Sequence, residues 1–404
     1  MPHVRTRIRR VPTRAERVRA AVLIGVAVLA GAGITAVDFA ADASVVPEVA
    51  TQVDPRNSDV LANLAENTAN TDLDAAHALA LRAIASNPLD DRALVVAALA
   101  RTSTNEIARA DGLFGLVTTL TRRQPLAGAW MFDVLASRGD YAGAIDHADA
   151  ALRRRSAADT DVMPVMIKIT GTGRALPALA RKLATMPPWR DDFFGALVRS
   201  KEGNGLALMT ALKQAGDHTA PVEVAAMASQ QIAAGSTANA RAVWLKGFGS
   251  PLPPLLSPNF EAMVQYGDFG WTFGARGGAQ IVARGDAADG KPGHALEVQP
   301  SRTGKRPLPV VQQAMLLESG GHRVTFEGRS VGGTQSVASV VVRCAGTDQE
   351  LGRAGVPAGQ HWAPGGFGFF VPPTDCPIQK LVIEAVPNLT QGGSPTLIDT
   401  FRVE

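Results

Sequence analysis

Cysteine is scarce in this 404-residue sequence, and so are aromatic residues. Only Cys344 and Cys376 are present, and aromatic side chains make up 5% of the chain. The two cysteines do not form a C-x-x-C pair, and the seven histidines are scattered. H-E-x-x-H and G-K-[ST] motifs are also absent. These absences do not favour a zinc site, a dithiol redox centre or a phosphate-binding loop.

The motifs that resemble catalytic sites have simpler structural interpretations. Gly328–Gly332 matches G-x-S-x-G, but turn and strand residues follow it where a nucleophile elbow requires a helix. Asp90-Asp91 and Asp191-Asp192 follow prolines, where acidic residues are typical of the first turn of a helix. No pair of acids is spaced for glycoside cleavage on a strand. The sequence therefore predicts a protein without enzymatic activity and without catalytic residues.

Positive charge is concentrated at the N-terminus. Residues 1–19 contain seven arginines and one glutamate, a net charge of +6, so the formal +3 of the whole chain leaves −3 for the remainder. A body with this charge does not favour nucleic acid as a partner.

A long uncharged segment follows the arginines. Residues 20–37 contain no charged side chain and would span about 27 Å as a helix, and no further Lys or Arg occurs before Arg56. The positive-inside rule then predicts a basic cytoplasmic tail at 1–19, a signal-anchor helix at 20–37 and a periplasmic body in a bacterial inner membrane. The alternative is a signal peptide cleaved after Ala43, which would give a secreted or periplasmic protein.

Small residues recur at helical spacing over residues 57–248. Ala76, Ala80 and Ala83 form one series, and Ala144, Ala148 and Ala151 form a second, 68 residues or twice 34 further on. A weaker series at the intermediate register consists of Ala110, Phe114 and Val117. This pattern predicts packed antiparallel helices.

The 34-residue interval resembles that of the tetratricopeptide repeat. The resemblance implies an array that docks a partner protein, here of the cell envelope. The first-helix consensus of that family is missing and the period is lost after residue 156, so an irregular helical bundle remains an alternative.

The composition changes after a proline-rich segment. Residues 249–258, with four prolines between Ser250 and Pro258, predict an extended linker. Residues 259–404 contain eight of the 14 phenylalanines and several period-two runs separated by turn residues. An antiparallel β-sandwich is therefore predicted for 259–404.

The beginning and the end of this region carry a resemblance. Asn259-Phe260-Glu261, Phe269-Gly270-Trp271 and the closing run Leu397–Phe401 are similar to jelly-roll carbohydrate-binding modules of bacterial extracytoplasmic proteins. The resemblance implies that the first and last strands pair, and that Glu261 and Asp399 hold a structural Ca²⁺. Strand parity places Asp399 on the inward face, together with Leu397, Phe401 and Val403, where a carboxylate requires compensation.

The same resemblance implies a polysaccharide ligand. Sandwiches recognise sugars by stacking aromatic faces on pyranose rings, and the aromatic candidates are Trp271, Phe273, Trp362 and Phe367. Because the periplasm is oxidising, Cys344 and Cys376 are predicted to form a disulfide. No cofactor is expected other than the Ca²⁺.

Two functions from different classes follow. The first is a non-enzymatic, membrane-tethered envelope protein whose helices dock a partner and whose sandwich binds a neutral or weakly acidic glycan. This layout resembles accessory proteins of exopolysaccharide assembly or export. The alternative is a pure protein–protein scaffold of an envelope complex, with no glycan ligand.

Overall fold

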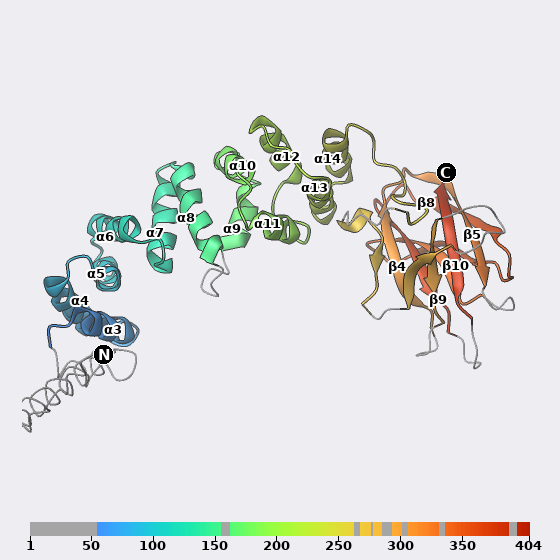
Figure 1. Ribbon diagram of the computed structural model, residues 1–404. Coiled ribbons are helices and arrows are strands. Elements are labelled where there is room, and N and C mark those ends of the chain that lie inside the picture. Colours follow the sequence, from blue (N-terminus) through green and yellow to red (C-terminus); the bar gives the residue numbers. More distant parts are fainter. Residues whose placement is uncertain are drawn as a thin grey trace, which may run out of the picture. The chain divides into compact units, whose positions relative to one another are not determined.

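The computed structural model (Figure 1) describes residues 55–154, 162–261, 267–275, 278–284, 293–300, 306–330, 336–387 and 394–404. The predicted basic tail, signal-anchor and cleavage site lie outside these residues. Within the described ranges, no helix combines the length and apolar character needed to cross a bilayer. The chain divides into two compact units, Met1–Asp159 and Thr160–Glu404. The last helices therefore share a unit with the sandwich.

Twelve helices precede the strands in the described part of the chain. Those of the first unit are α3 (Ser58–Ala69), α4 (Leu73–Ser86), α5 (Asp91–Ser103), α6 (Ile107–Leu120), α7 (Pro125–Ser137) and α8 (Tyr141–Arg154). Those of the second unit are α9 (Val162–Ile169), α10 (Leu176–Ala184), α11 (Arg190–Leu197), α12 (Gly205–Gln214), α13 (Pro221–Ala233) and α14 (Thr237–Phe248). The predicted order of helices followed by strands is confirmed.

Helix starts in the first unit recur at a fixed interval. Helices α4, α6 and α8 begin at Leu73, Ile107 and Tyr141, and α5 and α7 begin at Asp91 and Pro125, so each step is 34 residues. Each of the three predicted series is buried at the contacts between these helices. Small side chains at these positions let neighbouring helices approach closely, which is why they predicted the helical packing.

Polar residues define where several helices begin. The side chain of Asp90 accepts a hydrogen bond from the backbone N–H of Ala93, at 3.1 Å, and so caps α5. Asp191 and Asp192 lie in the first turn of α11, where they complement the helix dipole. The structural interpretation of these paired acids is therefore confirmed.

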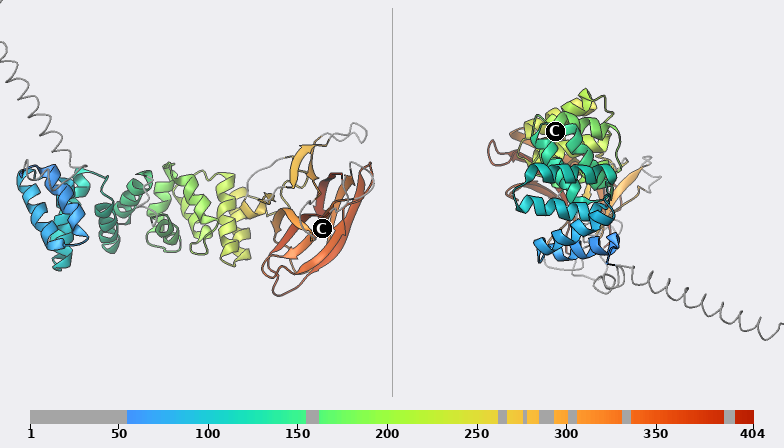
Figure 2. Two further views of the ribbon diagram at one scale, coloured as in Figure 1. Left: turned by 90° about the horizontal axis from the view of Figure 1, so that it is seen from below. Right: turned by 90° about the vertical axis from the view of Figure 1, so that its left-hand side faces the viewer.

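The C-terminal region is a sandwich of two antiparallel five-stranded sheets (Figure 2). The order of one sheet is β1-β4-β9-β6-β7, and we call it sheet A; the order of the other is β2-β3-β10-β5-β8, and we call it sheet B. The strands are β1 (Thr272–Phe273), β2 (Ala279–Ala283), β3 (His294–Val298), β4 (Leu308–Met315), β5 (Gly320–Ser330), β6 (Ala338–Cys344), β7 (Glu350–Gly355), β8 (Ala363–Val371), β9 (Gln379–Ala385) and β10 (Thr396–Val403). The predicted jelly-roll-like sandwich is confirmed.

The last strand differs from its prediction in two ways. Strand β10 lies between β3 and β5, whereas β1 pairs with β4, so the first and last strands are not partners. The register of β10 shifts between Asp399 and Arg402, and Thr400 there has a positive φ of 56°. Ile398 and Phe401 consequently both reach the core, and Asp399 pairs with the outward Glu327. The predicted inward parity of Leu397 and Asp399 is wrong because a bulge interrupts the alternation.

The predicted disulfide is present. Cys344 ends β6 and Cys376 precedes β9, and their Cα atoms are 5.2 Å apart. Beside the bond, the backbone N–H of Ala345 donates to the carbonyl of Ile378 at 2.9 Å. The covalent link and this hydrogen bond join the ends of two neighbouring strands of sheet A.

Candidate functional site: a groove and a cavity beside strand β1

Of the four predicted aromatic residues, Trp271 and Phe273 line the groove described below, whereas Trp362 and Phe367 lie elsewhere in the sandwich. Trp271 is buried in the core between Phe260 and Phe401, and its indole N–H donates to the carbonyl of Ser257 at 2.9 Å. Phe367 is half-buried and packs against the same core. The structure therefore does not bring the four rings together as one platform, and their binding of sugar stays a prediction.

Trp362 stacks on charged groups at the outward face of sheet B. The guanidinium carbon of Arg284 lies 4.1 Å from the centroid of the indole ring, and that of Arg329 lies 5.4 Å from it. The indole N–H of Trp362 is buried without a hydrogen-bond partner among the described residues. Guanidinium groups thus pack against this ring as cation–π partners.

Glu261 and Asp399 have different partners. Asp399 forms a buried ion pair with Arg284, which also contacts Glu327 at 2.7 Å. Burial raises the pKa of Asp399, and the guanidinium opposes this shift. Glu261 instead accepts hydrogen bonds from the backbone N–H of His294, at 2.7 Å, and contacts its ring at 3.0 Å, which lowers the pKa of Glu261.

The compensation that Asp399 requires is thus supplied by an arginine side chain. In the ranges that the structure describes, no group of three or more His, Cys, Asp or Glu side chains is arranged to hold a metal. The Ca²⁺ shared by Glu261 and Asp399 stays a prediction.

Phe273, the remaining aromatic candidate, lies at a groove between the helices and the sandwich. The groove has a volume of about 660 Å³ and is bounded by α11, α13 and the segment that leads into β1. Phe273 is 37% exposed, and Phe194 and the buried Trp271 contribute two further rings to the lining. Charged groups on the α11 side are Asp191 and Arg199. An aromatic ring, a carboxylate and a guanidinium therefore share one concave surface.

A buried arginine fixes the helical wall of this groove. The guanidinium of Arg190 donates to Asp217 through Nη1 and Nη2, both at 2.9 Å, and to the carbonyl of Leu183. It also pairs with Glu223 of α13 and lies over the ring of Phe194, 5.5 Å from the centroid. Because one side chain joins α11 to the start of α13, the positions of Asp191 and Phe194 relative to α13 are set by the core.

The segment leading into β1 is attached to the same helix. The backbone N–H of Asp268, in the short helix η2 (Gly267–Phe269), donates to Ser229 of α13 at 3.3 Å. Gly267 has a φ of +57°, and a Cβ there would lie 2.6 Å from the hydroxyl oxygen of Ser229. A glycine is therefore required where η2 approaches α13. The ring of Phe269 packs on Trp244 of α14, with centroids 5.5 Å apart.

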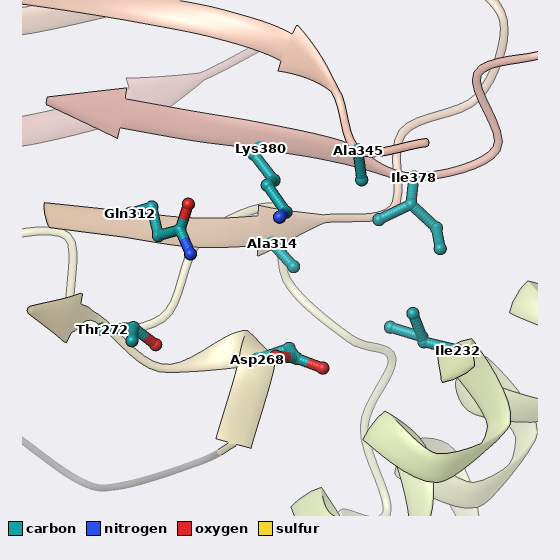
Figure 3. A pocket seen from close by; sticks show the side chains of 8 residues that line it. All are labelled: Ile232, Asp268, Thr272, Gln312, Ala314, Ala345, Ile378 and Lys380. Carbon is teal, nitrogen blue, oxygen red and sulfur yellow. The ribbon is translucent and has the colours of Figure 1, made fainter. Parts of the chain in front are cut away.

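A smaller cavity also borders this segment (Figure 3). Its volume is about 210 Å³. Its lining residues are Ile232, Asp268, Thr272, Gln312, Ala314, Ala345, Ile378 and Lys380. The strands of sheet A supply Thr272, Gln312 and Lys380, whereas Ile232 faces them from α13 (Figure 3). Burial raises the pKa of Asp268, and the positive charge of Lys380 opposes this rise.

Sequence reasoning found Trp271 and Phe273 and missed the polar residues of both sites. Gln312 and Lys380 are outward-facing positions of β4 and β9, and Asp191 belongs to a helix far away in the sequence. Period-two alternation marks the outward residues of a strand, but it does not say which strands are neighbours. The alternation could therefore have marked Gln312 and Lys380 as outward-facing residues, but it could not have placed them in one site.

No family model and no curated protein sequence matches this chain. Solved structures that are similar in the sandwich region include three carbohydrate-binding modules. TmCBM61, in complex with β-1,4-galactotriose, has 14% identity and a TM-score of 0.24, over 38% of this chain and 98% of that chain. The CBM22-1 xylan-binding domain of Xyn10C from Paenibacillus barcinonensis has 17% identity and a TM-score of 0.26, over 37% of this chain and 92% of that chain.

The third is the module CBM6cm-2 from Cellvibrio mixtus lichenase 5A, in complex with cellotriose. It has 15% identity and a TM-score of 0.22, over 31% of this chain and 86% of that chain. At these identities and TM-scores the likeness assigns no function to the chain. A helical array followed by a jelly-roll-like sandwich is the class that the fold defines.

Proposed function

We propose that this protein is a non-enzymatic envelope protein that binds a polysaccharide in the groove beside β1 and docks a partner protein on its helices. The observation that carries the proposal is the composition of the groove, where the exposed ring of Phe273 lies in the same lining as Asp191 and Arg199. Membrane tethering and a role in exopolysaccharide assembly or export belong to the same proposal.

The chemistry of the groove suits a sugar chain. The C–H faces of a pyranose ring pack on an aromatic ring, while its hydroxyls both donate and accept hydrogen bonds. Asp191 supplies acceptors and Arg199 supplies donors on the α11 side. A volume of about 660 Å³ lies within the range of ligand-binding clefts.

The partner-docking proposal rests on the first unit. The 34-residue interval between helix starts supports a tetratricopeptide-like array. Four large apolar side chains within α6 and the start of α7 are about 40% exposed: Ile107, Leu116, Leu120 and Leu126. Leu116 and Leu120 are one turn apart on α6, and exposed apolar patches are typical of surfaces that bind another protein.

The tether and the compartment rest on the sequence and the disulfide. Seven arginines before an uncharged run of 18 residues support a single span with the N-terminus inside. The disulfide between Cys344 and Cys376 supports an oxidising compartment for the sandwich. Both observations agree with a body outside the cytoplasm.

A binding experiment on the full-length protein tests the glycan proposal. We would screen an array of cello-, xylo-, galacto- and manno-oligosaccharides and measure each hit by calorimetry. Phe273→Ala is expected to weaken the hit about tenfold, or about 1.4 kcal/mol. Phe370→Ala is the matched control, because Phe370 is 60% exposed but lies on sheet B. No bound oligosaccharide, or equal affinities for the two variants, would favour the scaffold function instead.

A further inference from the structure

The cavity between α13 and sheet A gathers four polar side chains of four different kinds. Asp268 offers a carboxylate, Lys380 an ammonium, Gln312 an amide and Thr272 a hydroxyl. Within the described part of the chain, none of these four side chains forms a hydrogen bond or an ion pair. Polar groups that converge on a hollow without internal partners are positioned for a ligand.

The charges in the cavity select the class of that ligand. An anionic ligand would meet Asp268, and a cationic ligand would meet Lys380. A hydroxyl both donates and accepts, so it bonds a carboxylate and an ammonium at the same time. The set of groups therefore suits an uncharged compound with several hydroxyls.

The size and the apolar wall restrict the ligand further. A volume of about 210 Å³ equals that of about seven water molecules. The apolar part of the lining consists of Ile232, Ala314, Ala345 and Ile378. These side chains provide a surface for the C–H face of a single ring.

We propose that this cavity binds a single uncharged pyranose ring. Thr272 lines both the cavity and the groove that contains Phe273, so the two sites meet at β1. The ring is then a terminal or branch residue of the polysaccharide in the groove. This last step rests on the proposed function, whereas binding of the ring itself does not.

The test is a titration of the full-length protein with free D-glucose, D-galactose, D-mannose and D-xylose, each to 100 mM, followed by saturation-transfer NMR. At least one sugar is expected to show saturable binding to the wild type. Lys380→Met removes the ammonium, and Ile232→Trp fills the cavity. Each variant should weaken sugar binding at least tenfold. Lys201→Met is the matched control, because Lys201 is an exposed lysine outside both sites. Its affinity should equal that of the wild type.

Melting temperatures of the variants show whether each folds, and Gln312→Leu replaces any variant that does not. Absence of saturable binding by all four sugars would overturn the inference, and so would unchanged affinity in the folded cavity variants. Phe273→Ala separates this inference from the proposed function, because it should weaken oligosaccharide binding and leave monosaccharide binding intact. Monosaccharide binding without any oligosaccharide hit would overturn only the groove proposal.

Discussion

Arg190 and Glu223 form a bidentate ion pair in the interior of the second unit, with Nε–Oε1 and Nη2–Oε2 distances of 2.5 and 2.7 Å. Both residues are almost fully buried. Because Glu223 also accepts a hydrogen bond from the backbone N–H of Ala220 at 2.8 Å, the pair determines where α13 begins. The groove beside β1 thus depends on a charge pair within its own wall.

Removing Arg190 should strongly destabilise the second unit. Arg190→Met leaves Glu223 and Asp217 buried without their cation, which typically costs about 3–5 kcal/mol. Urea denaturation measures the loss. Arg153→Met is the control, because the side chain of Arg153 is 49% exposed in its ion pair with Asp149 and should contribute less than about 1 kcal/mol. Equal losses in the two variants would contradict this account.

The stability of the fold near Asp268 should depend on pH. Burial raises the pKa of Asp268 above its ordinary 3.8, so ionisation is less favourable in the folded protein than in the unfolded chain. The stability that protonated Asp268 contributes to the fold is fully present below pH 3.8, and it is lost as the pH rises through the raised pKa. Asp268→Asn should therefore raise the melting temperature at pH 7 and leave it unchanged near pH 3.

Thermal melts of the wild type and of Asp268→Asn between pH 3 and pH 8 provide the measurement. Asp133→Asn is the control, because Asp133 is exposed. The difference between Asp268→Asn and the wild type should grow with pH, and that for Asp133→Asn should not. A constant difference across the range would mean that the carboxylate of Asp268 is not penalised by burial.

The two tryptophans of the sandwich should respond differently to truncation. Trp271→Ala removes a core side chain and should cost about 3–5 kcal/mol. Trp362→Ala removes a half-buried ring from the outward face of sheet B and should cost less. Urea denaturation of both variants makes the comparison. A smaller loss for Trp271→Ala than for Trp362→Ala would contradict the burial described above.

Substitutions around Asp399 test whether an arginine or a metal ion compensates the charge of its buried carboxylate. Arg284→Met should destabilise the protein by about 3–5 kcal/mol, because it leaves a buried carboxylate without its charged partner. Arg402→Met is the control, because Arg402 is exposed on β10, the strand that contains Asp399. It should have little effect on stability. If Arg284 is the only cation that compensates Asp399, EDTA should leave the melting temperature unchanged. A fall on chelation would instead support a Ca²⁺ held by Glu261 and Asp399.

Much of the architecture could be predicted because it depends on local patterns. Small residues such as Ala76 and Ala144 indicated helix contacts, and period-two runs indicated strands. The pairing of Cys344 with Cys376 followed from their being the only two cysteines. In each case the physical cause lies within one element or in a simple count.

The prediction failed where a single residue changes the backbone or where distant residues meet. The bulge at Thr400 reverses the alternation of β10, so parity assigned Asp399 to the wrong face. Arg284 reaches Asp399 across 115 residues of sequence, and no spacing rule marks such a pair. The groove and the cavity likewise combine helices with strands that are far apart in the chain.

The disulfide also determines how the sandwich would respond to mechanical tension. Cys344 and Cys376 enclose β7 of sheet A and β8 of sheet B, with a sequence separation of 32 residues. When force is applied through the two ends of the chain, it passes across the sulfur–sulfur bond and bypasses this loop. About 100 Å of extension therefore stays unavailable until the bond is reduced. Under load, the oxidised protein would therefore unfold in a shorter step than the reduced protein.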